Sequence, residues 1–292
     1  MGMLIPLFKT LRPKQWSKNV FVFAALVFDV KLFAAGPLFR TVAGAVLFCL
    51  LSSTVYIIND LVDIEKDRQH PTKRNRPLAS GALSPRAAVI AAIVIAAIGL
   101  PLSFWLEPSF GAITLGYVIM MIAEPFWLKN MVIIDVMTIA AGFVLRVIAG
   151  VVLVHVERFS PWLYVCTTLL ALFLAVGKRR NELFLLKDNA NNHRTILNEY
   201  TMGFIDEMIA ILSAATLIAY SLYTFSAENL PKDHTMMLTL PFVLYGLFRY
   251  LYLIHVKNAG GAPEEVVLRD KPLLAALGLW GLAVVVVLYV AQ

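Results

Sequence analysis

Nine apolar segments divide the chain and constrain its fold more than any other feature. They cover residues 19–36, 40–58, 86–104, 109–123, 132–154, 161–177, 207–226, 236–256 and 273–291. Most approach the roughly 20 apolar residues that an α-helix needs to cross a bilayer. Only 15% of all residues are charged, against about 25% in a soluble domain. The sequence therefore predicts an all-α membrane protein, with nine transmembrane helices in a single domain of residues 1–292.

The distribution of positive charge predicts how these helices are oriented. With the N-terminus in the cytoplasm, the inner segments contain nineteen Lys and Arg residues and the outer segments four. This bias follows the positive-inside rule, so we expect a multi-pass protein of the plasma (inner) membrane with its C-terminus outside. The net charge of +6 lies in loops between spans, where it favours lipid head groups or phosphates and not nucleic acid.

An acidic segment follows the second apolar segment. With an advance of about 100° per residue, Asn59, Asp63, Asp67 and Asp60 fall within about 100° of each other on a helix. Carboxylates that share one helix face repel each other unless a cation lies among them. Mg²⁺ prefers such oxygen ligands together with substrate phosphates. The sequence therefore predicts a magnesium site facing the cytoplasm, and the alternative is a solvated loop between two spans.

Two groups of basic residues accompany the acidic segment on the inner side. Lys73, Arg74 and Arg76 follow it directly and would hold phosphate groups. Residues 178–180, which are Lys, Arg and Arg, are expected to end the sixth span. This triplet either binds a second phosphate or only anchors the topology.

A charged pair is expected on the fifth span. Arg146 is surrounded by apolar residues, so it should face an interior cavity and have a partner. Asp135 lies eleven residues earlier, about three turns, and points the same way. A structural link between Asp135 and Arg146 is therefore one explanation of both residues.

Several motifs accompany the acidic segment and residues 56–60 (YIIND). They lie at residues 11–20 (LRPKQWSKNV), 70–77 (HPTKRNRP), 142–150 (GFVLRVIAG), 177–183 (GKRRNEL) and 268–272 (LRDKP). Together they resemble the UbiA superfamily of intramembrane prenyltransferases, whose nine helices surround a central cavity. The likeness is greater to its branch of decaprenyl-phosphate phosphoribosyltransferases, which serve cell-wall biosynthesis. One position departs, because Glu124 stands where that branch usually has Tyr, five residues before Lys129.

The resemblance implies an enzyme that transfers 5-phosphoribose from phosphoribosyl diphosphate to a polyprenyl phosphate, releases diphosphate and requires Mg²⁺. Its metal ligands would be Asn59, Asp60, Asp63 and Asp67, of which the three aspartates are the expected catalytic residues. The expected substrate-binding residues are Lys18, Tyr56, Lys73, Arg74, Arg76, Lys129, Asp135, Arg146, Lys178, Arg179 and Arg180. The partners are both substrates and the bilayer, and a homo-oligomer is one option.

Two other functions compete with this interpretation. The first is prenyl transfer from a polyprenyl diphosphate to an aromatic or similar acceptor. Enzymes of that kind resemble this chain but typically have a second Asp-rich motif after the sixth span, where only the isolated Asp188 and Asp206 occur here. The second is a transporter, which would need polar positions through the full thickness of the membrane. The charged clusters here favour one side.

Overall fold

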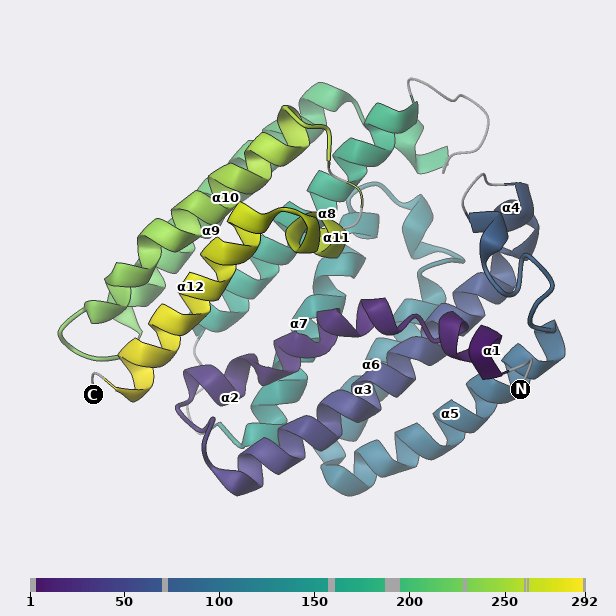
Figure 1. Ribbon diagram of the computed structural model, residues 1–292, viewed down its shortest axis with the longest axis horizontal. Helices are drawn as coiled ribbons and strands as arrows, with labels where there is room; N and C mark the ends of the chain where they lie inside the picture. Colours follow the sequence, from purple (N-terminus) through teal and green to yellow (C-terminus); the bar gives the residue numbers. More distant parts are fainter. Residues whose placement is uncertain are drawn as a thin grey trace. The chain divides into compact units, whose positions relative to one another are not determined.

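A computed structural model describes residues 4–69, 73–156, 161–186, 195–227, 230–259, 261 and 263–290. Within these residues every regular element is helical (Figure 1). The α-helices are α1 (Leu4–Thr10), α2 (Ala24–Phe28), α3 (Ala35–Val62), α4 (Ile64–Gln69), α5 (Pro85–Leu106), α6 (Pro108–Ala123), α7 (Ile134–Val154), α8 (Pro161–Leu186), α9 (Met202–Ser226), α10 (Leu240–His255), α11 (Pro263–Arg269) and α12 (Lys271–Tyr289). The 3₁₀ helices are η1 (Pro13–Phe23), η2 (Lys73–Asn75), η3 (Leu128–Asn130), η4 (Thr195–Glu199) and η5 (Thr235–Thr239).

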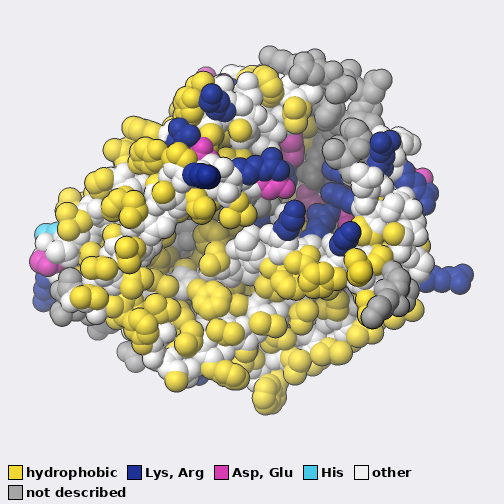
Figure 2. All heavy atoms as spheres, viewed as in Figure 1, with side chains coloured by type: hydrophobic (Ala, Val, Ile, Leu, Met, Phe, Trp, Pro, Cys, Tyr) yellow, Lys and Arg dark blue, Asp and Glu magenta, His cyan; other side chains and the backbone are white. Residues whose placement is uncertain are grey.

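Seven helices among the described residues are long and apolar enough to cross a bilayer. They are α3, α5, α7, α8, α9, α10 with η5, and α12, while α6 is a shorter apolar helix. The helix α5 exposes large apolar side chains such as Ile90, Ile93 and Trp105. Figure 2 shows hydrophobic side chains over most of the face in view. The prediction of an all-helical membrane protein is confirmed.

The first apolar segment, residues 19–36, does not form one helix. The chain passes from η1 into the short α2, and α3 begins only at Ala35. Val30 has a left-handed backbone with φ 53°, and such a residue interrupts a helix. Lys31 forms an ion pair of 2.7 Å with Asp29 on the other side of Val30, and this pair accompanies the turn.

The sixth apolar segment was predicted to end at residue 177, but α8 continues to Leu186. The added residues include Lys, Arg, Glu and Leu, which favour helices, and no proline or glycine follows Gly177 within α8. The basic triplet at residues 178–180 therefore lies on a helix. Asp188 and residues 70–72 of the HPTKRNRP motif lie outside the described residues.

The contacts divide the chain into two compact units. The first unit contains Met1–Leu26, Phe33–Lys129 and Leu145–His155. The second unit contains Val27–Leu32, Asn130–Val144 and Val156–Gln292. The prediction of a single domain remains a prediction.

In the first unit, α3 packs against α5, α6 and η1. Its core includes Phe48, whose ring centroid lies 4.8 Å from that of Tyr117. A second cluster joins Ile57 of α3 to Leu78 and Leu83, which lie in the loop between η2 and α5. Burial of Leu78 and Leu83 fixes this loop beside the end of α3, which is where the acidic segment lies.

In the second unit, α8 lies alongside α9, and α10 alongside α12 (Figure 1). The core includes Phe173, whose ring centroid is 5.3 Å from that of Tyr250. Asp270 begins α12 by accepting a hydrogen bond from the N–H of Leu273 at 2.9 Å. Arg249 binds the same carboxylate through Nε and Nη2, at 3.1 Å and 2.8 Å. The LRDKP motif therefore contains a helix cap.

Candidate active site

The acidic segment lies where α3 gives way to α4, in the first unit. It is not one continuous helix, because Asp63 has φ −96° and ψ 8° and ends α3. The helical register nevertheless continues through this break. The N–H of Asp63 donates to the carbonyl of Asn59 at 3.0 Å, and the N–H of Asp67 donates to that of Asp63 at 2.8 Å. The side chains therefore keep a spacing close to that of an unbroken helix.

Asp60 and Asp67 are buried and bind arginines. Each is 3% exposed. Arg76 Nη1 lies 3.0 Å from Asp60 Oδ1 and 2.6 Å from Asp67 Oδ2. Arg12 Nη2 also donates to Asp60 Oδ1. Buried carboxylates need a counter-charge, and these two arginines supply it.

Asn59 and Asp63 have oxygen atoms that remain available. Asn59 Oδ1 is buried and has no hydrogen-bond partner among the described residues. Asp63 is half-buried, and the described part of the chain offers its carboxylate no ion pair. These two side chains lie one helical turn apart and are hard oxygen donors of the kind that Mg²⁺ takes.

The structure does not gather all four predicted metal ligands around one point. Within the described residues, no three His, Cys, Asp or Glu side chains are placed to hold a metal ion. Asp60 and Asp67 face arginines in this structure. Metal binding by all four residues therefore remains a prediction, and Asn59 and Asp63 are the members with oxygen atoms to spare.

Arg12, which binds Asp60, has a strained backbone. Its φ of 52° and ψ of 61° are left-handed. Residues other than glycine adopt this conformation at a cost of about 1–2 kcal/mol. Such strain persists where the surroundings hold the residue, often at functional sites. The guanidinium carbon of Arg12 also lies 5.2 Å from the ring centroid of Tyr56. We call Arg12, Tyr56, Asn59, Asp60, Asp63, Asp67 and Arg76 the acidic site.

The strain at Arg12 leads to a first prediction. Arg12→Gly and Arg12→Ala both remove the ion pair with Asp60, but only glycine adopts a positive φ without strain. We expect Arg12→Ala to be less stable than Arg12→Gly by about 1 kcal/mol. Thermal unfolding of both variants in one detergent measures this difference. If the two variants unfold at the same temperature, the left-handed backbone is not costly.

Four other predicted substrate-binding residues lie in the same unit. Lys18 is half-buried on η1. It is near enough to Tyr117 on α6 for its positive charge to interact with the tyrosine hydroxyl. Lys73 and Arg74 are exposed on η2, shortly before Arg76. Lys129 is half-buried on η3, and its N–H donates to the carbonyl of Glu124 at 3.0 Å.

The predicted link between Asp135 and Arg146 is wrong. Both lie on α7, but eleven residues of helix separate them by about 16 Å, which is too far for an ion pair. Arg146 Nε instead donates to Asn19 Oδ1 at 2.8 Å, and its Nη2 donates to Tyr117 at 2.9 Å. Arg146 is 4% exposed.

Asp135 belongs to a buried network of the second unit. Arg179 Nε donates to Asp135 Oδ2 at 2.6 Å, and Arg179 also donates to Glu182. The hydroxyl of Tyr200 donates to Asp135 Oδ1 at 2.8 Å and accepts from the N–H of Ile133 at 2.8 Å. Burial raises the pKa of Tyr200 to about 12, so the phenol stays protonated and can donate.

The three residues of the basic triplet have different surroundings. Arg179 is fully buried in the network above. Arg180 Nε lies 2.7 Å from Asp206 Oδ1, and its Nη1 donates to the carbonyl of Ile254 at 2.7 Å. Lys178 is 39% exposed and lies 3.9 Å from Glu182. Lys178 is therefore the most exposed residue of the triplet.

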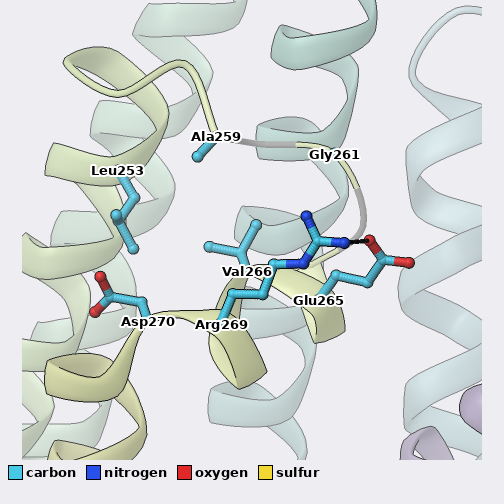
Figure 3. A pocket seen from close by; sticks show the side chains of 7 residues that line it. All are labelled: Leu253, Ala259, Gly261, Glu265, Val266, Arg269 and Asp270. Carbon is cyan, nitrogen blue, oxygen red and sulfur yellow. Dashed lines mark ion pairs between the residues drawn. The ribbon is translucent and has the colours of Figure 1, made fainter.

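A pocket of about 270 Å³ lies elsewhere in the second unit (Figure 3). It is lined by Leu253, Ala259, Gly261, Glu265, Val266, Arg269 and Asp270. Arg269 and Glu265 pair with each other across 3.5 Å at its edge. None of the predicted site residues lines this pocket, so it does not locate the active site.

Sequence reasoning missed several polar residues that the structure connects to predicted ones. They include Arg12, Asn19, Tyr117 and Tyr200, and Glu182 and Asp206, which bind Arg179 and Arg180. Arg12 and Asn19 belong to the LRPKQWSKNV motif, which was the available signal for them. Tyr117 and Tyr200 stand in no motif that was recognised.

The apolar helices and the charged groups at their ends define the class of this protein, an integral membrane protein made of helices. The model of the UbiA prenyltransferase family matches residues 20–266. The chain belongs to the UbiA prenyltransferase family, and it is therefore a membrane-embedded transferase.

Named relatives and a solved structure resemble the chain over nearly its whole length. It is 31% identical to decaprenyl-phosphate phosphoribosyltransferase of Mycolicibacterium smegmatis, over 95% of this chain and 92% of the relative. It is 32% identical to the enzyme of that name in Corynebacterium glutamicum, over 97% and 86%. A UbiA homolog from Archaeoglobus fulgidus bound to GPP and Mg²⁺ has a TM-score of 0.73 at 20% identity, over 98% of this chain and 100% of that one. The last likeness concerns the fold alone.

Proposed function

We propose that this protein transfers 5-phosphoribose from phosphoribosyl diphosphate to a polyprenyl phosphate of the decaprenyl-phosphate type, and releases diphosphate. The observation that carries this proposal is the acidic site, where two arginines lie beside two available oxygen ligands. A donor with several phosphate groups needs both kinds of partner. The named relatives, which match nearly the whole chain, support the same activity.

Magnesium suits the available oxygen atoms of the acidic site. We propose Asn59 and Asp63 as its ligands, joined by Asp60 and Asp67 when their arginines bind phosphate instead. When bound, Mg²⁺ would neutralise charge on the departing diphosphate. The amide oxygen of Asn59, buried without a hydrogen bond, supports this choice of ligand.

The proposed reaction forms one bond and breaks one bond. A phosphate oxygen of the lipid bonds to the anomeric carbon of ribose, and the bond from that carbon to diphosphate breaks, with the electron pair leaving on diphosphate. Arg12 and Arg76 would hold the donor phosphates, with Lys18, Lys73 and Arg74 around them. The carboxylates of Asp60 and Asp67 would stabilise the positive charge that develops on the sugar carbon.

The acceptor carries its own phosphate and needs a further cation. Among the basic triplet we propose Lys178 for this role, because its side chain is 39% exposed, whereas those of Arg179 and Arg180 are 1% and 11% exposed. Tyr56, Lys129 and Asp135 remain substrate-binding predictions. For Asp135, the network with Arg179 supports a structural contribution as well.

We also propose nine crossings, with the N-terminus in the cytoplasm, the C-terminus outside and a central cavity within one domain. The helix α6 and the seven longer helices supply eight crossings. The ninth is η1 followed by α2, which together rise about 30 Å, close to the hydrocarbon thickness of a bilayer. The positive charges support an active site on the cytoplasmic face of the plasma membrane.

A matrix of donors and acceptors tests the proposed reaction. Purified protein in detergent is given labelled phosphoribosyl diphosphate or a prenyl diphosphate, each with decaprenyl phosphate or an aromatic acid. We expect lipid-linked phosphoribose only from the first donor with the lipid phosphate, and its loss when EDTA removes Mg²⁺. Product only from the prenyl diphosphate and the aromatic acid would overturn the proposal in favour of prenyl transfer. No product in any arm, together with uptake of a solute by vesicles, would favour a transporter.

A further inference from the structure

The 3₁₀ helix η1 has an unusual length and three distinct rows of side chains. It runs for 11 residues, whereas most 3₁₀ helices stop after three or four. Because residues i and i+3 eclipse in this geometry, every third residue shares a row. Trp16, Asn19 and Val22 form an inner row, in which Asn19 and Val22 are 2% and 0% exposed. The row of Lys14, Ser17 and Val20 is exposed.

The inner row is attached to α3 by side-chain hydrogen bonds. Trp16 Nε1 donates to Ser53 Oγ at 3.0 Å, and Ser53 in turn donates to the carbonyl of Leu11 at 2.9 Å. Asn19 Nδ2 donates to Cys49 Sγ at 3.1 Å. These contacts repeat every turn of η1, so they fix how the helix lies along α3.

The helix α7 attaches to the same row from another side. Arg146 Nε donates to Asn19 Oδ1 at 2.8 Å. Its guanidinium carbon lies 5.2 Å from the ring centroid of Phe48 and 4.8 Å from that of Tyr117.

One turn further along α7, a Cβ on Gly150 would lie 2.0 Å from the carbonyl oxygen of Val22. The backbones therefore meet at this position. Arg146 and Gly150 on α7 match Asn19 and Val22 on η1, one turn apart on each element.

The third row of η1 contains Gln15, Lys18 and Phe21. It begins directly after Arg12, which precedes η1, binds Asp60 of the acidic site and accepts a hydrogen bond from the N–H of Gln15 at 2.8 Å. Lys18 lies within electrostatic range of Tyr117, the partner of Arg146. A slip of η1 by one residue would move this row by about 2 Å and turn it by about 120°. A neighbouring residue would then occupy the position that Lys18 has now.

We infer that Asn19 and Arg146 are positioning residues, which fix the register of η1 so that Lys18 contacts a phosphate of the phosphoribosyl diphosphate donor. This inference rests on the proposed function. It gives Arg146 a role that differs from direct substrate binding, since its side chain is almost fully buried and held by Asn19 and Tyr117.

A double-mutant cycle between Asn19 and Lys18 tests this coupling. We expect Lys18→Ala and Asn19→Ala each to raise the KM for phosphoribosyl diphosphate about tenfold, the scale of one charge-assisted hydrogen bond. The double variant should be no worse than Lys18→Ala alone, because Asn19 acts through Lys18. The KM for polyprenyl phosphate should stay unchanged. Ser17→Ala, on the exposed row, is the matched control and should behave like the wild type.

The conservative variant Asn19→Asp sharpens the test. It keeps an oxygen acceptor for Arg146 Nε, so we expect it to recover most of the donor affinity that Asn19→Ala loses. A merely structural role of Asn19 would lower stability and kcat in both variants alike. Additive effects of Lys18→Ala and Asn19→Ala on the donor KM would overturn the inference.

Hydrogen exchange separates this inference from the proposed function. Arg146→Lys lacks the fork that reaches both Asn19 and Tyr117, so amides of residues 13–23 should exchange about tenfold faster than in the wild type. Arg86→Lys, an exposed arginine at the start of α5, is the control and should not change exchange. Unchanged exchange in Arg146→Lys overturns the positioning role. Faster exchange in a protein without phosphoribosyl transfer supports the attachment of η1 and rejects the proposed substrate.

Discussion

Asp63→Asn is expected to lower the kcat of phosphoribosyl transfer by about 100- to 1,000-fold, the scale for removal of one group that stabilises transition-state charge. The reason is that Asp63 supplies a carboxylate that no described arginine or lysine neutralises, beside the buried amide oxygen of Asn59. Because the carboxylate forms no ion pair within the described residues, its loss should leave the unfolding temperature unchanged. Steady-state assays over a range of Mg²⁺ concentrations measure the effect.

Glu65→Gln is the matched control for this prediction. Glu65 lies on the neighbouring α4, is exposed, and pairs with Arg68 at 2.7 Å. Its amide variant should keep wild-type kcat and the wild-type dependence on Mg²⁺. Wild-type turnover in Asp63→Asn would show that this carboxylate is not a metal ligand, and Asp60 and Asp67 would then be the next variants to measure.

Arg179→Ala is expected to destabilise the protein by about 3–5 kcal/mol, because it leaves the buried carboxylate of Asp135 without its counter-charge. Arg179 and Asp135 are 1% and 0% exposed, and their atoms Nε and Oδ2 lie 2.6 Å apart. We expect the variant to unfold at a much lower temperature in detergent or to fail to accumulate. A thermal unfolding series of Arg179→Ala, Lys178→Ala and the wild type measures this.

Lys178→Ala is the matched control, since it removes a neighbouring positive charge that is 39% exposed. It should unfold near the wild-type temperature and raise the KM for polyprenyl phosphate. Equal stability of Arg179→Ala and Lys178→Ala would contradict the structural role of Arg179. In that case the whole triplet would again be a candidate for binding the acceptor phosphate.

Much of the fold could be predicted because its main signal is local. A run of apolar residues predicts a membrane helix whatever lies around it, and α3, α5, α7 and α12 follow their apolar runs closely. The prediction of one helix for the first apolar segment was wrong, because the interruption depends on the backbone of a single residue, the left-handed Val30. Hydrophobicity carries no information about that angle.

The acidic site could be predicted in its spacing but not in its pairing. The helical repeat predicts that Asn59 and Asp63 lie one turn apart and that Asp60 lies near Asp67. The choice of Arg12 as a partner for Asp60 joins residues 48 positions apart, and no periodicity encodes such a contact. The same limit explains the error at Asp135, whose partners Arg179 and Tyr200 lie 44 and 65 positions further along the chain.

The contact between α7 and η1 has a consequence for the evolution of related sequences. A methyl group at position 150 would collide with the carbonyl of Val22, and a backbone atom cannot move aside as a flexible side chain can. We therefore expect glycine at this position in any homologue that keeps the same crossing. A larger residue there should appear only in lineages whose N-terminal segment has taken a different path.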